Sequence, residues 1–463
     1  MVKSENDSKK NKYAIDMCNG PLLKKMLLFS IPLMCSSILQ LLFNAADIIV
    51  VGRFAGSDSL AAVGSNSALI SLLTNLFVGL SIGTNVLCAR FYGARRNDDL
   101  SKTIHTSMLI SLAGGILLTV VGVVFARPIL ILMQTPKDVL PLAVTYMKIY
   151  FAGMTAMMVY NFGSAILRAI GDTRRPLIFL SIAGALNVGL NLYFVICLHM
   201  DVAGVALATV ISQCLSAVLI IRCLMQEEGS LHLDIKLIRL NRAIFLQILR
   251  IGLPAGIQGI LFSLSNVIVQ SAVNGFGSTV VAGNSASANL ELFVYFAMNA
   301  FYQAAISFVS QNFGAGKLDR ILKILITCQI CVVSTGMLVG FTFLAFGPQL
   351  LGIYSTDAAV ISDGMIRLRM ICGTYFLCGI MEVMVGALRG LGCSIMPTIV
   401  SLLGACVLRI IWIMTIFQIP QYHTLTMLYV SYPVTWIITI SVHIICFIYV
   451  IKKLRTASSA QKS

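Results

Sequence analysis

The sequence predicts an all-α integral membrane protein whose twelve transmembrane helices form two six-helix lobes related by a pseudo-two-fold axis along the membrane normal. Three observations predict this fold: few charged residues, apolar segments of membrane-spanning length, and an internal repeat. Of the 463 residues, 58% are hydrophobic and 11% are charged. Since soluble proteins carry about a quarter charged residues, this composition is typical of a membrane protein with many spans.

Apolar segments recur from one end of the chain to the other. A helix needs about twenty apolar residues to cross a bilayer, and an open backbone without internal hydrogen bonds cannot cross it. We therefore predict twelve membrane helices, at residues 26–51, 60–88, 104–126, 139–167, 176–197, 202–225, 244–273, 280–309, 321–346, 359–388, 397–418 and 426–451.

The positions of the basic residues predict the orientation of the chain. A net charge of +15 would suit a nucleic-acid partner, but the charges lie in short loops between apolar segments, which fits a membrane topology better, so we expect no nucleic-acid partner. On the predicted topology, 26 of the 33 Lys and Arg residues fall on one side. Because cytoplasmic loops carry an excess of Lys and Arg, we expect a multi-pass protein of the cytoplasmic (inner) cell membrane with both termini in the cytoplasm.

The two halves of the chain match at an offset of about 221 residues. Ile31-Pro32 corresponds to Leu253-Pro254, and Leu167-Arg-Ala-Ile-Gly corresponds to Leu388-Arg-Gly-Leu-Gly. Six spans per half is an even number, so both halves enter the membrane in the same direction, as a parallel repeat. We divide the chain into an N-terminal tail (1–23), an N-lobe (24–225), a linker (226–243), a C-lobe (244–453) and a C-terminal tail (454–463). The linker is either an interfacial segment or an ordinary loop.

Two repeated lobes are typical of carriers that work by alternating access, in which the halves rock around a central site. The closest approach to a P-loop, Gly314-Ala-Gly-Lys317, lacks the first glycine and the Ser or Thr after the lysine, so an ion gradient is the expected energy source rather than ATP. A membrane-embedded enzyme would need clustered His and Asp at metal-binding spacing, and a channel would need rings of identical charges. Neither pattern occurs, so we expect no enzyme activity, no metal and no cofactor.

Several motifs resemble those of the multidrug and toxic compound extrusion (MATE) transporters. They are Phe29-Ser-Ile-Pro-Leu-Met, Asn44-Ala-Ala-Asp-Ile-Ile-Val-Val-Gly-Arg, Leu60-Ala-Ala-Val-Gly, Ser310-Gln-Asn-Phe-Gly-Ala and Gly386-Ala-Leu-Arg-Gly-Leu-Gly. The resemblance extends from about Lys24 to Lys453. It implies export of organic, often cationic, drugs or toxic compounds in exchange for protons or sodium, and hence a role in antibiotic resistance. The wider superfamily also contains flippases for lipid-linked sugars.

Asp47, Asn187 and Asn191 are the candidate cation-coupling residues. A charge inside a bilayer costs roughly 2.5–3.5 kcal/mol on insertion scales, so Asp47 needs a reason to be there. Asn187 and Asn191 are four residues apart, hence on one helix face, at a depth similar to that of Asp47. Their spacing fits either a proton- or cation-responsive site or an acid near the headgroups with two asparagines that bond between helices.

The resemblance favours the functional interpretation, because Asp47 and Asn187 fall on the family's acid and asparagine. Several proton-linked relatives carry an aspartate where this chain has Asn191, which leaves one carboxylate in the N-lobe spans. The span 244–273 lacks the acid of sodium-linked relatives. We therefore favour a proton as the coupling ion, with sodium as the alternative.

The polar groups of the second half differ from those of the first. At the places that correspond to the coupling residues stand Val269, Val407 and Ile411. The candidate substrate site or polar site of the C-lobe consists instead of Gln258, Glu291, Glu382 and Arg409. Glu291 and Arg409 lie near mid-bilayer depth, where they either pair with each other or serve coupling or substrate binding. Glu382 lies nearer the cytoplasmic end, where a gate is more plausible.

Pro32 and Pro254 occupy equivalent places in the first and seventh spans, and proline bends a helix by removing a backbone hydrogen bond. We expect a monomer among membrane lipids that takes small organic cations as substrates. The alternative is a flippase for a lipid-linked or anionic precursor, which the basic residues Arg367, Arg369 and Arg409 would suit.

Overall fold

The computed structural model describes residues 13–460, most of which lie in helices. Within this part of the chain, ten helices are long and apolar enough to cross a membrane, and two bent helix pairs raise the number of spans to twelve. The predicted all-helical membrane fold with twelve spans is therefore confirmed. The ends of the two predicted tails, residues 1–12 and 461–463, lie outside the described residues.

Each span overlaps one predicted apolar segment, and most spans begin a few residues before it. The unbroken helices are α1 (Leu22–Phe54), α2 (Ser57–Gly93), α3 (Asn97–Val124), α8 (Asp201–Met225), α9 (Arg242–Asn274), α10 (Ser278–Gly314), α11 (Leu318–Ala345) and α17 (Leu425–Ala460). Two further spans contain π-helical segments. The fifth span is α7 (Arg174–Leu192) with η1 (Tyr193–Cys197), and the eleventh is α15 (Ile395–Ser401), η4 (Leu402–Val407) and α16 (Leu408–Met414).

Two predicted spans are broken near their middle. The span predicted at 139–167 consists of α5 (Leu140–Ala152) and α6 (Met154–Ala169), which meet at 45°. The span predicted at 359–388 consists of α13 (Ala358–Cys372) and α14 (Tyr375–Gly390), which meet at 41°. A glycine, Gly153 or Gly373, stands at each break. The short helices α4 (Ala126–Leu132) and α12 (Gly347–Gly352) also correspond in the repeat.

By packing, the chain divides into two compact units. Within the described residues, the first comprises 13–19 and 35–256, and the second comprises 20–34 and 257–460. These boundaries lie inside α1 and α9, whereas the sequence-based division followed the loops at 24–225 and 244–453. Both helices run without interruption through Pro32 and Pro254, and the units divide two residues after each proline. The bend expected at each proline remains a prediction.

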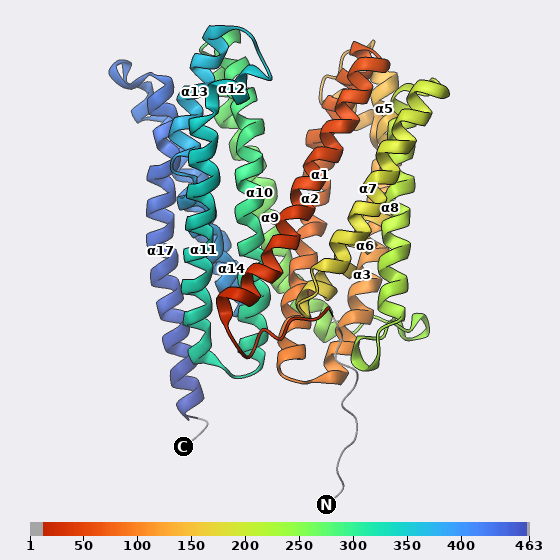
Figure 1. Cartoon of the computed structure of the whole chain (residues 1–463), viewed down its shortest axis with the longest axis vertical. Helices are drawn as coiled ribbons and strands as arrows, with labels where there is room; N and C mark the ends of the chain where they lie inside the picture. Colours follow the sequence, from red (N-terminus) through yellow and green to blue (C-terminus); the bar gives the residue numbers. More distant parts are fainter. Residues whose placement is uncertain (1–12, 461–463) are drawn as a thin grey trace, which may run out of the picture. The chain divides into compact units, whose positions relative to one another are not determined.

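In the first unit, α2, α3 and α6 pack on one another, and α7 and α8 lie side by side (Figure 1). The start of α9 belongs to this unit because it approaches α2 along a line of glycines. A Cβ atom on Gly79 would lie 2.3 Å from the backbone nitrogen of Gly256, and one on Gly83 would lie 2.5 Å from the carbonyl oxygen of Ile248. Only glycine permits such a close crossing of two helices.

In the second unit, α10 is the central helix and contacts α11, α13 and α14, while α17 packs on α13 and α14. The start of α1 belongs to this unit through aromatic and sulfur contacts. The ring of Phe29 meets that of Phe308 edge-on, with centroids 5.6 Å apart, and the thiol of Cys328 donates to Met26 Sδ at 3.3 Å.

The predicted linker is an ordered strap on α3 with two short 3₁₀ turns, η2 (Gly229–Leu231) and η3 (Ile235–Leu237). The backbone N–H of Asp234 donates to Nε2 of the buried His105 at 3.1 Å, and the opposite ring nitrogen lies 2.7 Å from the carbonyl oxygen of Ser101. Thr106 donates its hydroxyl to Arg239 O and accepts from the backbone N–H of Asn241. The end of this strap therefore holds the start of α9 against α3.

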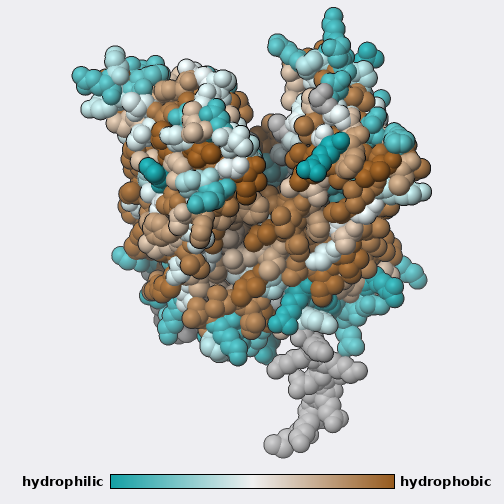
Figure 2. Space-filling view, turned by 45° about the horizontal axis from the view of Figure 1, so that its top comes forward, coloured by the Kyte–Doolittle hydropathy of each residue, from teal (hydrophilic) through white to brown (hydrophobic). Residues whose placement is uncertain are grey.

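Hydrophobic residues cover the middle of the face seen in Figure 2, and hydrophilic residues gather toward the ends of the helices. Many large apolar side chains are exposed, and Leu338 and Ile445 are 71% and 67% exposed. Such extensive apolar exposure is unfavourable in water and favourable in lipid.

Candidate functional site

The candidate coupling residues lie where α1 passes α7 within the first unit. Gly184, one turn before Asn187, makes this approach possible, because a Cβ atom there would lie 1.8 Å from the ring of Phe43. Phe43 in turn precedes Asp47 by about one helical turn. The packing of an aromatic ring on a glycine therefore sets the level at which Asp47 faces the asparagines of α7.

Asp47, Asn191 and Asn187 form one continuous hydrogen-bonded network. Asn191 Nδ2 donates to Asp47 Oδ1, and it also lies 3.4 Å from Asn187 Oδ1. Asp47 is half-buried, whereas Asn187 and Asn191 are 6% and 1% exposed. The structure thus brings the three predicted residues together.

Thr209 of α8 completes the network and was missed by the sequence analysis. Asn187 Nδ2 donates to Thr209 Oγ1 at 3.3 Å, and the threonine hydroxyl donates to the carbonyl oxygen of Val205 at 3.0 Å. A lone threonine in an apolar helix carries no sequence signal, because such hydroxyls usually bond their own backbone. The π-helical segment η1 follows Asn191 directly, and π-bulges are frequent at functional sites.

This network supplies one carboxylate, two amide groups and one hydroxyl. Among the residues that the structure describes, the buried Asn191 Oδ1 has no hydrogen-bond partner. Since buried amide oxygens are usually satisfied, this atom is the open position of the network. A proton on Asp47, or an oxygen-seeking cation between Asp47 and Asn191, would satisfy it.

In the second unit, Glu291 pairs with Arg367 and not with Arg409, so the Glu291–Arg409 pair, one of the two alternatives that the sequence left open, is wrong. Arg367 Nε and Nη2 donate to the two carboxylate oxygens of Glu291, each at 2.7 Å. Arg409 instead lies over the ring of Tyr432, 3.7 Å from its centroid, and donates to Thr435 at 3.3 Å. The positions of Glu291 and Arg409 along their spans placed both at a similar depth in the membrane. They could not show which arginine side chain faces Glu291.

Gln258 belongs to a different cluster, built around the buried Arg389. Arg389 donates to Tyr302 Oη at 2.5 Å, to Gln258 Oε1 at 2.8 Å and to Thr398 Oγ1 at 3.3 Å. Glu382, which is half-buried, lies within electrostatic reach of Arg389. Of the four residues expected to form one polar site, Gln258 and Glu382 therefore share the surroundings of Arg389, whereas Glu291 and Arg409 make separate contacts.

Comparison with known proteins identifies the family. The MatE family model matches residues 32–193 and again 254–415, once in each half of the repeat. The chain is 26% identical over 430 residues to "Probable multidrug resistance protein YoeA" of Bacillus subtilis, covering 90% of this chain and 91% of the relative. It is 24% identical over 398 residues to "Multidrug export protein MepA" of Staphylococcus saprophyticus, covering 84% and 87% of the two chains.

Solved structures share the fold. An outward-facing multidrug resistance MATE transporter superposes with a TM-score of 0.90 at 22% identity, covering 97% of this chain and all of the other. A superfamily transporter from Pyrococcus furiosus, whose reversed binding-pocket polarity suggests a different function, superposes with a TM-score of 0.89 at 21% identity, covering 95% and 98%. With the fold and both family matches in agreement, the chain belongs to the MatE family of multidrug and toxic compound extrusion proteins, which are membrane transporters and not enzymes.

Proposed function

We propose that the protein is a secondary active antiporter that exports organic cations, including drugs and toxic compounds, in exchange for protons by alternating access. The names of its relatives, a multidrug resistance protein and a multidrug export protein, support this substrate class. The observation that carries the coupling proposal is the single carboxylate of Asp47 in the network with Asn187, Asn191 and Thr209. Because the network contains one carboxylate, a single positive charge is enough to neutralise it.

Protonation of Asp47 would change both the charge and the hydrogen bonding of this network. The ionised carboxylate accepts from Asn191 Nδ2 and attracts a cationic substrate. A protonated carboxyl becomes a donor, and the open Asn191 Oδ1 offers the acceptor that it needs. Proton entry would therefore remove the negative charge and reorganise the contact between α1 and α7, and both changes favour release of the cation.

Sodium is the second candidate coupling ion. The same unsatisfied Asn191 Oδ1, together with Asp47 and the Thr209 hydroxyl, offers oxygen atoms of the kind that hard cations prefer. One carboxylate would leave bound sodium without excess charge. Transport coupled to either ion would require Asp47. Only the imposed gradient that drives transport would differ between the two ions.

The decisive experiment measures uptake of ethidium, an organic cation, by proteoliposomes with an imposed pH gradient or an imposed sodium gradient. We expect the pH gradient to drive uptake and Asp47→Asn to abolish it. The matched control is Asp138→Asn, which removes an exposed carboxylate outside the spans. Normal pH-driven transport by Asp47→Asn would sink the coupling role, and transport that follows only the sodium gradient would assign sodium in place of the proton.

We also propose that both termini are cytoplasmic, that the protein acts as a monomer in the cell membrane, and that it contributes to antibiotic resistance. The flippase alternative is weakened by the arginines that suggested it. Arg367 is neutralised by Glu291, and Arg409 is covered by Tyr432, which leaves only Arg369 of the three exposed. Transport of an anionic lipid precursor in the same proteoliposomes, without ethidium transport, would restore that alternative.

A further inference from the structure

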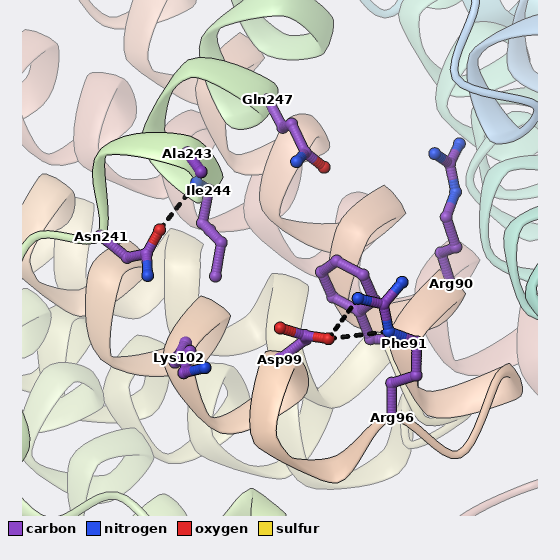
Figure 3. A pocket seen from close by; sticks show the side chains of 9 residues that line it. All are labelled: Arg90, Phe91, Arg96, Asp99, Lys102, Asn241, Ala243, Ile244 and Gln247. Atoms are coloured by element: carbon purple, nitrogen blue, oxygen red, sulfur yellow. Dashed lines mark hydrogen bonds and ion pairs between the residues drawn. The ribbon is translucent and has the colours of Figure 1, made fainter.

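A basic cavity lies at one end of the first unit, away from the coupling network. It has a volume of about 350 Å³ and is formed by the end of α2, the turn into α3, the first turns of α3 and the start of α9 (Figure 3). A smaller cavity of about 60 Å³, which shares Lys102 and Asn241 with the first, continues under the strap. Neither cavity contains Asp47 or its partners.

The cavity lining is positively charged even after its internal ion pair is counted. Arg90, Arg96 and Lys102 line it, against one carboxylate, Asp99. Asp99 is already engaged, because Arg96 Nε and Nη2 lie 2.7 and 2.6 Å from Asp99 Oδ2. Among the residues that the structure describes, no carboxylate forms an ion pair with Lys102. The basic side chains of the lining therefore outnumber its one carboxylate, and Lys102 is available to a ligand.

Apolar and amide groups complete the lining. Phe91 and Ile244 are buried beside the charges, and the guanidinium of Arg96 lies 5.2 Å from the ring centroid of Phe91. Asn241 and Gln247 approach from the start of α9, opposite Arg96 (Figure 3). This mixture suits a ligand that has an anionic end and an apolar end.

The walls are fixed before any ligand binds. Asn241 caps the start of α9 by accepting from the backbone N–H of Ile244 at 3.1 Å, and its own N–H donates to Thr106 on α3 at 3.2 Å. The bond from Asp234 to His105 anchors the strap to the same helix. A ligand would not have to order these segments, and such pre-organisation favours binding.

The cavity lies at the ends of membrane spans, where lipid headgroups are found. α2 ends at Gly93, α3 begins at Asn97, and α9 begins at Arg242. Basic pockets between transmembrane helices on the cytoplasmic side recognise anionic lipid headgroups. We propose that this cavity binds the phosphate of an anionic phospholipid, with Lys102 as the cationic contact and Phe91 and Ile244 beside the glycerol and upper acyl chain.

The second half of the repeat provides a matched comparison. Lys323 corresponds to Lys102, on the first turns of α11. There, the neighbouring Arg320 donates to the carbonyl oxygen of Gly20 at 2.7 Å, so the equivalent start of α1 is tied to the loop directly. Lys323 is exposed and basic like Lys102 but lies outside the cavity.

The test adds dioleoyl phosphatidylglycerol or dioleoyl phosphatidylcholine to the full-length protein in detergent and counts bound lipids by native mass spectrometry. We expect one phosphatidylglycerol to bind more tightly than phosphatidylcholine. Lys102→Gln should weaken this binding roughly fivefold, since a basic residue near an anionic lipid surface contributes about 1 kcal/mol. Gln247→Glu, which adds a repelling charge at an exposed position, should weaken it at least as much. Lys323→Gln should leave it unchanged.

Three outcomes would overturn the proposal. The first is equal binding of the two lipids. The second is unchanged phosphatidylglycerol binding in both Lys102→Gln and Gln247→Glu, or equal weakening in Lys323→Gln. The third is displacement of phosphatidylglycerol by millimolar inorganic phosphate, which would assign the cavity to a soluble anion. Because none of these measurements involves transport, the result is independent of the coupling ion.

Discussion

Glu291 and Arg367 form a two-pronged ion pair inside the second unit, with both N–O distances at 2.7 Å. Their side chains are 7% and 11% exposed. Asn284 Oδ1 accepts two further hydrogen bonds, one from Arg367 Nη1 at 2.6 Å and one from the hydroxyl of Tyr429 at 2.9 Å. The pair therefore ties α10 to α13 and, through Tyr429, to α17.

Breaking this pair should destabilise the protein strongly. Removal of one partner leaves a buried charge uncompensated, which costs about 3–5 kcal/mol. We expect Glu291→Gln and Arg367→Gln each to lower the unfolding temperature of the purified protein, and the double variant to lose less than the sum of the two.

Arg409→Gln provides the control for these single and double variants. Because Arg409 contacts Tyr432 and Thr435, its effect should add to that of Glu291→Gln without coupling. Strong coupling between Glu291 and Arg409, with none between Glu291 and Arg367, would contradict the ion pair seen in the structure.

Gly184 should be the least replaceable residue of α7, because its missing side chain admits the ring of Phe43. Gly184→Ala would press a methyl group into that ring and push α1 away from Asn187, at a cost of about 1–3 kcal/mol for overpacking. We expect lower thermal stability and slower ethidium transport.

Gly189 is the matched control on the same helix, because no atom within 4 Å would meet a Cβ atom there. Gly189→Ala should change stability by no more than about 1 kcal/mol, the difference in helix propensity. Equal losses in the two variants would show that α7 needs glycine for a reason other than the approach of Phe43.

The membrane fold was predictable because long apolar segments have one stable arrangement in lipid, a hydrogen-bonded helix. The breaks at Gly153 and Gly373 were not, since single glycines also occur within continuous membrane helices such as α7. The compact units were also hidden from the sequence. Loops suggested boundaries at residues 225 and 244, but packing of the Gly79–Gly83 segment on the start of α9 places the division at residue 256.

The coupling network was predictable in part because two asparagines four residues apart share a helix face. Thr209 was not predictable, since a lone threonine in an apolar helix carries no sequence signal. The Glu291–Arg367 pair was missed for another reason. The sequence places Arg409 near the depth of Glu291, and only the packing of α10 on α13 shows that Arg367 is the partner.

Gln258 should contribute to stability through Arg389. It accepts one hydrogen bond from the guanidinium of Arg389, a residue that is 3% exposed. Gln258→Leu would leave that donor unsatisfied, at a cost of about 1–3 kcal/mol. We expect a lower unfolding temperature for Gln258→Leu, and little change for Asn266→Leu, an exposed position on the same helix. If Gln258→Leu kept its stability but lost transport, a direct role in substrate binding would replace this structural one.

Arg95 occupies a backbone conformation that normally requires glycine. The turn from α2 to α3 places Arg95 at φ 56°, and the repeat-related turn from α10 to α11 has Gly316 at φ 71°. Both turns close with the same bonds, Arg96 N to Phe91 O at 3.0 Å and Lys317 N to Asn312 O at 2.9 Å. A left-handed conformation costs an L-residue roughly 1–2 kcal/mol, partly offset by the greater freedom of glycine in the unfolded chain.

The two turns should therefore respond in opposite directions to exchanged residues. Arg95→Gly should stabilise the protein by about 0.5–1 kcal/mol, and Gly316→Arg should destabilise it by a similar amount, as measured by thermal unfolding of the purified variants. Arg95→Asn should fall between Arg and Gly, because asparagine tolerates the left-handed region better than arginine does. A shift of the same sign in Arg95→Gly and Gly316→Arg would mean that side-chain contacts, and not backbone strain, decide which residue each turn accepts.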